Sequence, residues 1–235
     1  MPTLTPDTPF DLVHIGKCGG ITVARELQAA HFQFRHFHWR RPIPATGIRY
    51  LILARDPVAR FVSAFNWRKH LYANGTLPQP QFAGPLSELR HRPERDFLFH
   101  FKDANSLAEQ LGTQGVHEVT NATSLLGLIG HVPQGFDWYL SHLLEQIKAN
   151  QIAGVICTER LADDFDHIFG FRPKLEIHRI EPPQSTWISK EGRANLIREF
   201  HREYAALHKL MLMTQDAGVQ MSMRYDPEHG AITNM

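Results

Sequence analysis

The chain has 235 residues, a formal net charge of +1 and two cysteines. This length suits one domain with a proper hydrophobic core, and the balanced charge gives no global field for nucleic acid or an anionic membrane, so any anion site must be local. Two cysteines are too few for a disulfide framework, and the first nine residues carry neither the basic region nor the apolar run of a signal peptide. We therefore expect a soluble, cytoplasmic protein with no nucleic-acid or membrane partner.

The first quarter of the chain alternates short apolar runs with a helical pattern. Phe10–Ile15 is an apolar run that ends at a glycine, which is typical of a buried strand entering a turn. Thr22–Ala30 repeats apolar residues at helical spacing. Phe32–Trp39 alternates aromatic and polar residues, which predicts a second strand. Ile48–Ala54 predicts a third, buried strand, and Pro57 opens the helix that follows it.

The rest of the chain continues this alternation after an irregular stretch. Prolines make Asn74–Glu94 the least regular part, and the wider region 74–135 is predicted to be an irregular and helical insertion that could cover an acceptor site. The remaining predicted elements are helices within Leu107–Lys148, a strand at Ile152–Cys157, a helix at Leu161–Phe169, a strand at Lys174–Ile180 and a long helix at Ser189–Ala217. The pattern predicts a single α/β domain over residues 1–235, with a central, mostly parallel sheet of about five strands flanked by helices.

A glycine-rich segment, His14–Thr22, joins the first predicted strand to the first helix. Its glycines let the backbone approach a phosphate, the helix N-terminus can bind it, and Lys17 adds a mobile positive charge. The common nucleoside-triphosphatase loop is longer and has Ser or Thr after its lysine to hold magnesium, whereas Cys18 stands there in this chain. The segment predicts a P-loop-like, three-layer fold with a phosphate site unlike that of magnesium-dependent kinases. A glycine-rich turn with a chance lysine is the alternative.

A second segment, Arg55–Phe65, starts at the end of the third predicted strand and enters a helix. Arg55 can bind a phosphate with two parallel hydrogen bonds. Ser63 lies eight positions later, which is about two helical turns. Its hydroxyl can therefore reach the same anion only if that anion lies along the helix.

With these two segments the chain resembles the sulfotransferases that use 3′-phosphoadenosine 5′-phosphosulfate (PAPS), especially the carbohydrate branch that includes heparan- and chondroitin-type enzymes, and its bacterial relatives. The resemblance continues more weakly through Glu159–Phe165 and Arg198–Tyr204. It implies PAPS as co-substrate, adenosine 3′,5′-bisphosphate as product, and no metal. It also implies that Arg55 and Ser63 bind the 3′-phosphate. The residues of the first loop that it assigns to the 5′-phosphosulfate are Lys17, Cys18, Gly19, Gly20, Ile21 and Thr22.

Sulfuryl transfer places negative charge on the oxygen that bridges sulfur and phosphorus, and Lys17 is the predicted group that stabilises it. An alcohol acceptor also needs a base with a pKa near the working pH. Some carbohydrate sulfotransferases use a histidine at this place in the chain and others a glutamate. His36 and His38 lie on the same face of the second predicted strand. We expect His38 to be the base because it is nearer the carboxyl end of the strand, with His36 as the second candidate.

The acceptor is predicted only as a hydroxyl or amine of a carbohydrate or small molecule. Arg40 and Arg41 could bind an anionic acceptor or form a solvated rim, and Arg179 could reach the nucleotide or form a salt bridge. His131 could line the acceptor pocket or serve only in a turn. Aromatic residues that could form a platform for the acceptor, or belong to the core, are Phe37, Trp39, Trp67, Tyr72, Trp138 and Tyr139.

Three other functions are compatible with parts of this pattern. A P-loop kinase would use ATP and magnesium, and the residue after Lys17 counts against it. A module that only binds adenosine bisphosphate would need Arg55 and Ser63 but not the lysine. A zinc site at His36 and His38 would need further ligands at a recognised spacing, which the neighbouring sequence does not supply.

Overall fold

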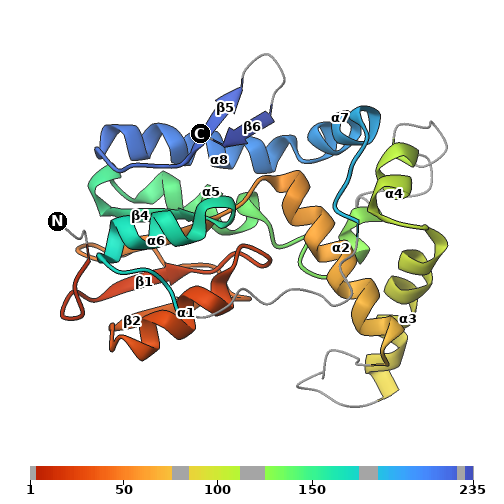
Figure 1. Ribbon diagram of the computed structural model, residues 1–235, viewed down its shortest axis with the longest axis horizontal. Coiled ribbons are helices and arrows are strands. Elements are labelled where there is room, and N and C mark those ends of the chain that lie inside the picture. The colour runs from red at the N-terminus through yellow and green to blue at the C-terminus, as the bar shows by residue number, and fades with distance from the viewer. Residues whose placement is uncertain (1–3, 76–84, 112–124, 175–184, 227–230, 235) are drawn as a thin grey trace. The chain divides into compact units, whose positions relative to one another are not determined.

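The computed structural model describes residues 4–75, 85–111, 125–174, 185–226 and 231–234. Strands and helices alternate through much of the chain (Figure 1). The strands are β1 (Phe10–Val13), β2 (Phe34–Phe37), β3 (Arg49–Ala54), β4 (Ile152–Cys157), β5 (Met223–Asp226) and β6 (Ala231–Asn234). The α-helices are α1 (Gly20–Ala29), α2 (Pro57–Ala73), α3 (Pro85–His100), α4 (Ala104–Gln110), α5 (Phe136–Gln146), α6 (Leu161–Phe169), α7 (Lys190–Glu199) and α8 (His201–Asp216). Short 3-10 helices are η1 (Leu125–Leu128), η2 (Ala149–Gln151) and η3 (Thr158–Arg160).

The chain forms two compact units. The first consists of Met1–Asp56, Gln134–His178 and His201–Met235, and the second of Pro57–Pro133 and Arg179–Phe200. The first unit contains the described strands with α1, α5, α6 and α8. The second contains α2, α3, α4 and α7.

The sheet of the first unit has the strand order β2-β1-β3-β4, and every neighbouring pair is parallel. All of β4 and all of β3 after Arg49 are buried, as expected for parallel strands that are covered on both faces. The α/β class and the parallel sheet predicted from the sequence are confirmed. The sheet has four strands among the described residues rather than about five. The predicted strand at Lys174–Ile180 falls almost wholly on residues 175–180, outside the described residues.

Helices pack closely on this sheet. A Cβ atom added to Gly154 of β4 would lie 2.6 Å from the side chain of Ile168, so α6 touches the sheet there. A Cβ added to Gly19, at the start of α1, would lie 2.7 Å from Leu161, so α1 and α6 are neighbours. Helices α5 and α8 pack against each other, and α8 also contacts β4. The sheet is thus flanked by helices of the same unit.

Two predicted elements need correction. The long helix expected at Ser189–Ala217 is interrupted at Phe200, where φ is −93° and ψ is 19°. Within the second unit the buried ring of Phe200 lies 5.9 Å from that of Phe61. The helix breaks at this packed residue, and no neighbouring Gly or Pro predicts the break from the sequence. The stretch Asn74–Glu94, expected to be irregular, contains the first part of α3, with Pro93 inside the helix. The antiparallel pair of β5 and β6 has no counterpart among the predicted elements.

In the second unit α4 and α7 hold each other through asparagines. Asn195 of α7 donates from Nδ2 to the carbonyl of Ala108 at 3.0 Å. Asn105 of α4 accepts from the backbone N–H of Ser189 at 2.7 Å, and the Ser189 hydroxyl in turn caps α7. These bonds satisfy polar groups at a helix end that would otherwise be costly to bury.

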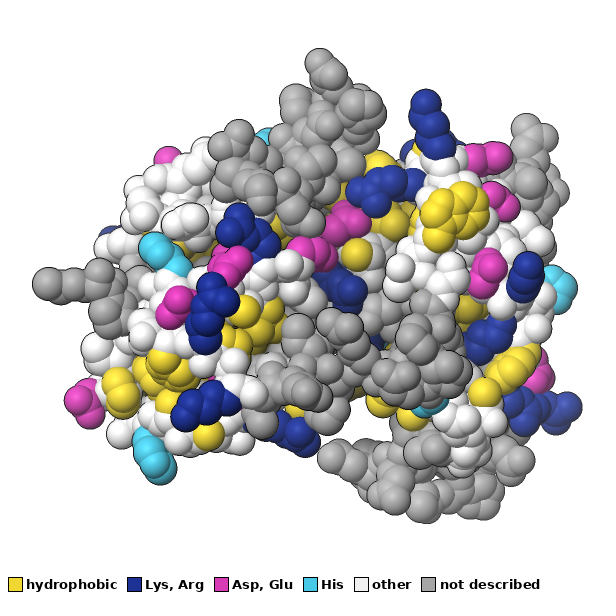
Figure 2. Space-filling view, viewed as in Figure 1, with side chains coloured by type: hydrophobic (Ala, Val, Ile, Leu, Met, Phe, Trp, Pro, Cys, Tyr) yellow, Lys and Arg dark blue, Asp and Glu magenta, His cyan; other side chains and the backbone are white. Residues whose placement is uncertain are grey.

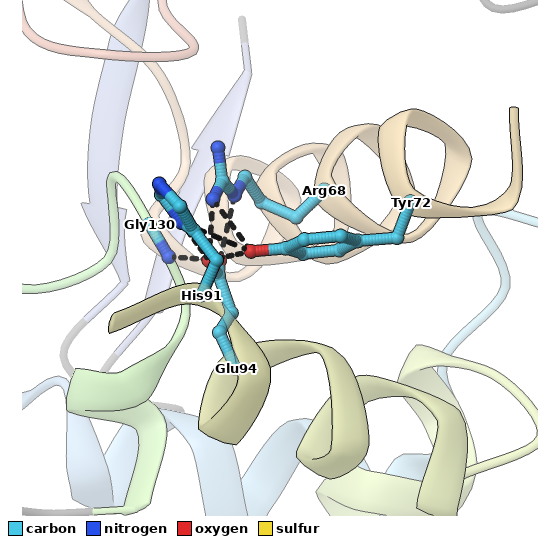
Figure 3. A network of polar contacts seen from close by, with 5 residues as sticks. All are labelled: Arg68, Tyr72, His91, Glu94 and Gly130. Atoms are coloured by element: carbon cyan, nitrogen blue, oxygen red, sulfur yellow. Dashed lines mark hydrogen bonds and ion pairs between the residues drawn. The ribbon is translucent and has the colours of Figure 1, made fainter. Parts of the chain in front are cut away.

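A buried polar network connects α2, α3 and the segment after η1 (Figure 3). Glu94 is 5% exposed, and its carboxylate accepts from Arg68 Nε at 2.6 Å, from the Tyr72 hydroxyl at 2.6 Å and from the Gly130 N–H at 2.7 Å. His91 Nδ1 lies 3.3 Å from the same hydroxyl. Burial alone would raise the pKa of Glu94, but these donors outweigh it and hold that pKa below its ordinary value. The network is therefore an ion pair whose carboxylate is satisfied from three directions.

Charges of both signs are mixed on one face of the molecule. Figure 2 shows Lys and Arg side chains interspersed with Asp and Glu wherever residues are described on the face in view. This agrees with the net charge of +1. An anion site must accordingly be built from a few neighbouring residues.

Candidate functional site

The two sequence motifs begin at neighbouring strand ends. β1 pairs with β3, with Val13 opposite Ile52. From β1 the chain passes through α1 to β2 on one side, whereas β4, which follows β3, lies on the other side. Parallel α/β sheets bind ligands beyond the carboxyl ends of strands at such a reversal of direction. His14 and Arg55, the first residues after β1 and β3, both lie at this edge.

The loop between β1 and α1 is a tight turn. Lys17 has a φ of 70° and Gly19 a φ of 74°, both in the left-handed region. The Cys18 N–H donates to the Ile15 carbonyl at 3.2 Å. Cys18 is 0% exposed, so only its backbone could meet a ligand. No side chain caps α1 and its first turn has no acidic residue, which suits an anion at this helix N-terminus.

The glycine pair of this loop is required by packing inside the protein. A Cβ on Gly20 would lie 2.0 Å from the ring of His14, and a Cβ on Gly19 would lie 2.7 Å from Leu161. Ile21 is 55% exposed, whereas Thr22 is buried. Close approach between the loop and its neighbours therefore explains both glycines without any ligand. Lys17, in the same loop, is half-buried.

Arg55 connects the second motif to the first. Its Nη1 donates to the Lys17 carbonyl at 3.0 Å. Its Nε is 3.7 Å from Glu159 Oε1, and this buried nitrogen has no hydrogen-bond partner among the described residues. The Asp56 N–H donates to the same Glu159 oxygen at 3.4 Å. Residues from β1, β3 and β4 thus meet at the carboxyl edge.

The neighbouring aspartate is held from a distant part of the chain. The Tyr204 hydroxyl of α8 donates to Asp56 Oδ1 at 2.8 Å, and both residues are buried. The Thr158 hydroxyl donates to the Ala54 carbonyl at 3.1 Å. These bonds fix the backbone on which Arg55 stands. Tyr204 is 148 positions from its partner, and the sequence offers no local signal for the contact.

Three histidines stack beside the loop. The rings of His14 and His38 are 3.9 Å apart, and those of His14 and His36 are 5.1 Å apart, with nearly parallel planes. His14 Nδ1 and His36 Nε2 are 2.9 Å apart, within hydrogen-bond distance. His36 and His38 share a face of β2 and its extension, as predicted. The sequence does not predict His14 as a member of the stack. Leu12 pairs with His36 in the parallel register, and strand alternation then brings His14 to the same face.

The hydrogen bonds of His38 fix its tautomer. Its Nδ1 is 3.1 Å from the His14 carbonyl, which can only accept, so Nδ1 carries the proton and a neutral ring has its lone pair on Nε2. Burial lowers the pKa of His38 although the His14 carbonyl opposes the shift. Burial, followed by His38 and Arg40, lowers the pKa of His36. Both rings thus favour the neutral, basic form.

An aromatic and basic rim follows the stack. Trp39 has a φ of 64° and is 54% exposed. Its backbone N–H donates to the hydroxyl of the buried Tyr139 at 2.9 Å. Its ring stands edge-on to His38 with centroids 4.9 Å apart. The guanidinium of Arg41 lies 5.1 Å from the Trp138 ring centroid, and that of Arg40 lies 4.9 Å from the Phe37 centroid. Phe37 and Tyr139 are buried, whereas Trp39 is exposed at this rim.

Other predicted site residues lie elsewhere. Ser63 is half-buried on α2 and belongs to the second unit. Arg179 lies outside the described residues. His131 is in the second unit with a φ of 77°, and Arg60, which is 1% exposed, donates to the carbonyls of His131 and Val132 at 2.7 and 3.1 Å. His131 is therefore part of a braced turn, and the sequence pattern did not single out Arg60 as its support.

The described residues contain no group of three or more His, Cys, Asp or Glu side chains arranged to hold a metal ion. In the histidine stack His14 Nδ1 lies against His36 Nε2 and His38 Nδ1 against the His14 carbonyl, and parallel rings do not direct three lone pairs at one point. No helix in the described part of the chain is long and apolar enough to cross a membrane. No protein-family model, curated protein or solved structure matches the chain.

Proposed function

We propose that the chain is a sulfotransferase that moves a sulfuryl group from PAPS to a hydroxyl or amine of a carbohydrate or small-molecule acceptor. The observation that carries the proposal is the bond from Arg55 to the Lys17 carbonyl, which joins the two sequence motifs where a parallel sheet binds its ligands. In the proposal the β1–α1 loop receives the 5′-phosphosulfate and Arg55 receives the 3′-phosphate. The assignment of Ser63 to that phosphate rests on the sequence alone, and the fold is of the P-loop-like, three-layer kind.

The proposed reaction is an in-line displacement that needs no metal ion. The acceptor oxygen forms a bond to sulfur while the bond from sulfur to the bridging phosphate oxygen breaks, and adenosine 3′,5′-bisphosphate leaves. Lys17 and the loop N–H groups stabilise the charge that develops on the bridging oxygen. The acceptor proton passes to Nε2 of His38, which the His14 carbonyl holds in the required tautomer.

Two observations favour this function over the alternatives. Cys18 stands where a magnesium-binding Ser or Thr would follow the lysine, and its side chain is buried away from any ligand. Lys17 stands in the loop between β1 and α1, where it brings a mobile positive charge to the proposed site of the 5′-phosphosulfate. A module that only binds adenosine bisphosphate would not need that charge.

The proposal is tested by calorimetric titration with adenosine 3′,5′-bisphosphate and, separately, with ATP and magnesium. We expect binding of the first and none of the second. Arg55→Ala should weaken the bisphosphate by about 10- to 100-fold, because a charge-assisted contact is lost. Arg172→Ala, which removes an arginine that is 67% exposed and paired with Asp163, should leave binding unchanged. Binding of ATP and magnesium alone would overturn the assignment.

A further inference from the structure

Glu159 is a carboxylate in the region proposed to bind a phosphate. It lies in η3, directly after β4, and so at the same carboxyl edge as Arg55. Its Oε1 is 3.7 Å from Arg55 Nε and accepts from the Asp56 N–H at 3.4 Å. The side chains of Glu159 and Arg55 are only 21% and 24% exposed. A phosphate on Arg55 would therefore share one half-buried cation with this carboxylate.

Titratable and charged groups surround Glu159 from several elements. Arg55 and Asp56 follow β3, and the Asp56 carboxylate is itself held by Tyr204 of α8. The Cys157 thiol ends β4. Arg160, the next residue along the chain, is 3.4 Å from Asp163. Burial raises the pKa of Glu159, Arg55 opposes this shift, and the Asp56 carboxylate adds to it. Negative charge is thus already crowded here before a ligand arrives.

We propose that a phosphate bound by Arg55 drives a proton onto Glu159, so that the nucleotide and one proton are taken up together. This inference rests on the proposed function, since it assumes that Arg55 binds the nucleotide. Two anions next to one cation in a half-buried site cannot both stay ionised without a large penalty, and protonation of the carboxylate removes the repulsion. Protonated Glu159 keeps a carbonyl oxygen for the Asp56 N–H, so the local structure is retained.

The sign of the pH effect follows from linkage. Ligand binding raises the pKa of Glu159 beyond its value in the free protein, so protons are taken up between the two values and affinity falls as pH rises. The limit for one proton is about tenfold per pH unit. The phosphate groups of the ligand work in the opposite direction, because they gain charge and bind Arg55 better as pH rises through about 6. A variant that lacks only the carboxylate separates the two effects.

The experiment is calorimetric titration of the full chain with adenosine 3′,5′-bisphosphate, at about pH 6 and about pH 8, in buffers of different ionisation enthalpy. Wild type should take up more protons than Glu159→Gln, which keeps an acceptor oxygen but cannot titrate. Glu159→Gln should also bind roughly tenfold more tightly at the higher pH, with a smaller gain at the lower pH. Asp163→Asn, at a carboxylate that is 49% exposed, should behave as wild type.

Equal proton uptake and equal affinity in wild type and Glu159→Gln would overturn the inference and leave the proposed function standing. Failure of wild type to bind the nucleotide at either pH would overturn both. If Glu159→Gln does not fold, infrared difference spectra of wild type give the same answer. A protonated carboxyl band should appear on nucleotide binding, and its absence would overturn the inference.

Discussion

His14 Nδ1 and His36 Nε2 lie 2.9 Å apart, so one proton serves two imidazole rings. The contact cannot survive with both rings as imidazolium, because each nitrogen would then be a donor. The ring of His38 stacks on that of His14, with centroids 3.9 Å apart, and the His14 carbonyl fixes its orientation. The stack is therefore built for neutral histidines, and acid should loosen it.

We expect the protein to lose stability as the pH falls below about 6.5. The pKa values of His36 and His38 are lowered in the folded state, so the unfolded chain binds more protons between those values and the ordinary histidine value, and stability rises with pH across that window. Melting temperatures between about pH 5 and about pH 7.5 measure this effect. His36→Gln should flatten the dependence, whereas His142→Gln, at an exposed position on α5, should not. A steeper dependence in His36→Gln would contradict the prediction.

The sequence predicts those elements that carry their own local signals. β4 and α6 have the predicted bounds, because β4 is an unbroken apolar run and α6 ends where Gly170 takes a left-handed conformation with a φ of 77°. The break at Phe200 and the helix through Pro93 have no such signal, because packing rather than propensity decides them.

The candidate site is predicted where motifs lie at strand ends, and missed where partners come from distant segments. Lys17, Arg55 and His38 are predicted from local pattern and strand alternation, and their roles stay predictions. His14 and Glu159 become neighbours of these residues only through the strand order β2-β1-β3-β4, which local pattern does not give. Glu159 lies in a segment whose weak resemblance predicts no role for it.

Lys17 should separate stability from function. Glycine adopts the left-handed conformation without strain, so Lys17→Gly should stabilise the folded state by about 1 kcal/mol. The greater conformational entropy of glycine in the unfolded chain offsets part or all of this gain. We expect the free energy of unfolding to stay the same or rise by up to about 1 kcal/mol, while transfer of sulfate from PAPS is lost. His31→Gly is the matched control, since His31 is exposed with a φ of 60° and should give the same change in stability with normal activity. Retained turnover in Lys17→Gly would remove the lysine from the mechanism.

Gly20 should not tolerate a side chain. The added Cβ of Gly20→Ala would lie 2.0 Å from His14, whose ring is backed by His38 and cannot retreat. Overpacking of this kind costs about 1–3 kcal/mol, and it should also disturb nucleotide binding by moving the loop. Gly127→Ala, at a position with nothing within 4 Å, is the control. Urea unfolding should show a clear loss of stability for the first variant alone, and equal values would show that the loop can shift freely.

Among the described carboxylates of the second unit, Glu94 should be the one on which folding depends most. Glu94→Gln leaves the buried Arg68 charge without its counter-ion, and breaking one side of a buried pair costs about 3–5 kcal/mol. Asp96→Asn, on the same helix, removes a carboxylate that is 55% exposed and paired with Arg92 and Arg95, and should cost about 0–1 kcal/mol. Chemical unfolding of both variants near neutral pH measures the contrast.

The dependence of the unfolding free energy on pH in acid gives an independent check on Glu94. Its pKa is lowered in the folded state, so the stability from this network is present above the ordinary glutamate value of about 4.3 and disappears as the pH falls through the folded value. The difference in unfolding free energy between wild type and Glu94→Gln should then be constant above about pH 5 and shrink in stronger acid. Asp96→Asn should show no such convergence. A difference for Glu94→Gln that persists unchanged into strong acid would mean that the loss comes from side-chain shape, and that the ion pair with Arg68 contributes little.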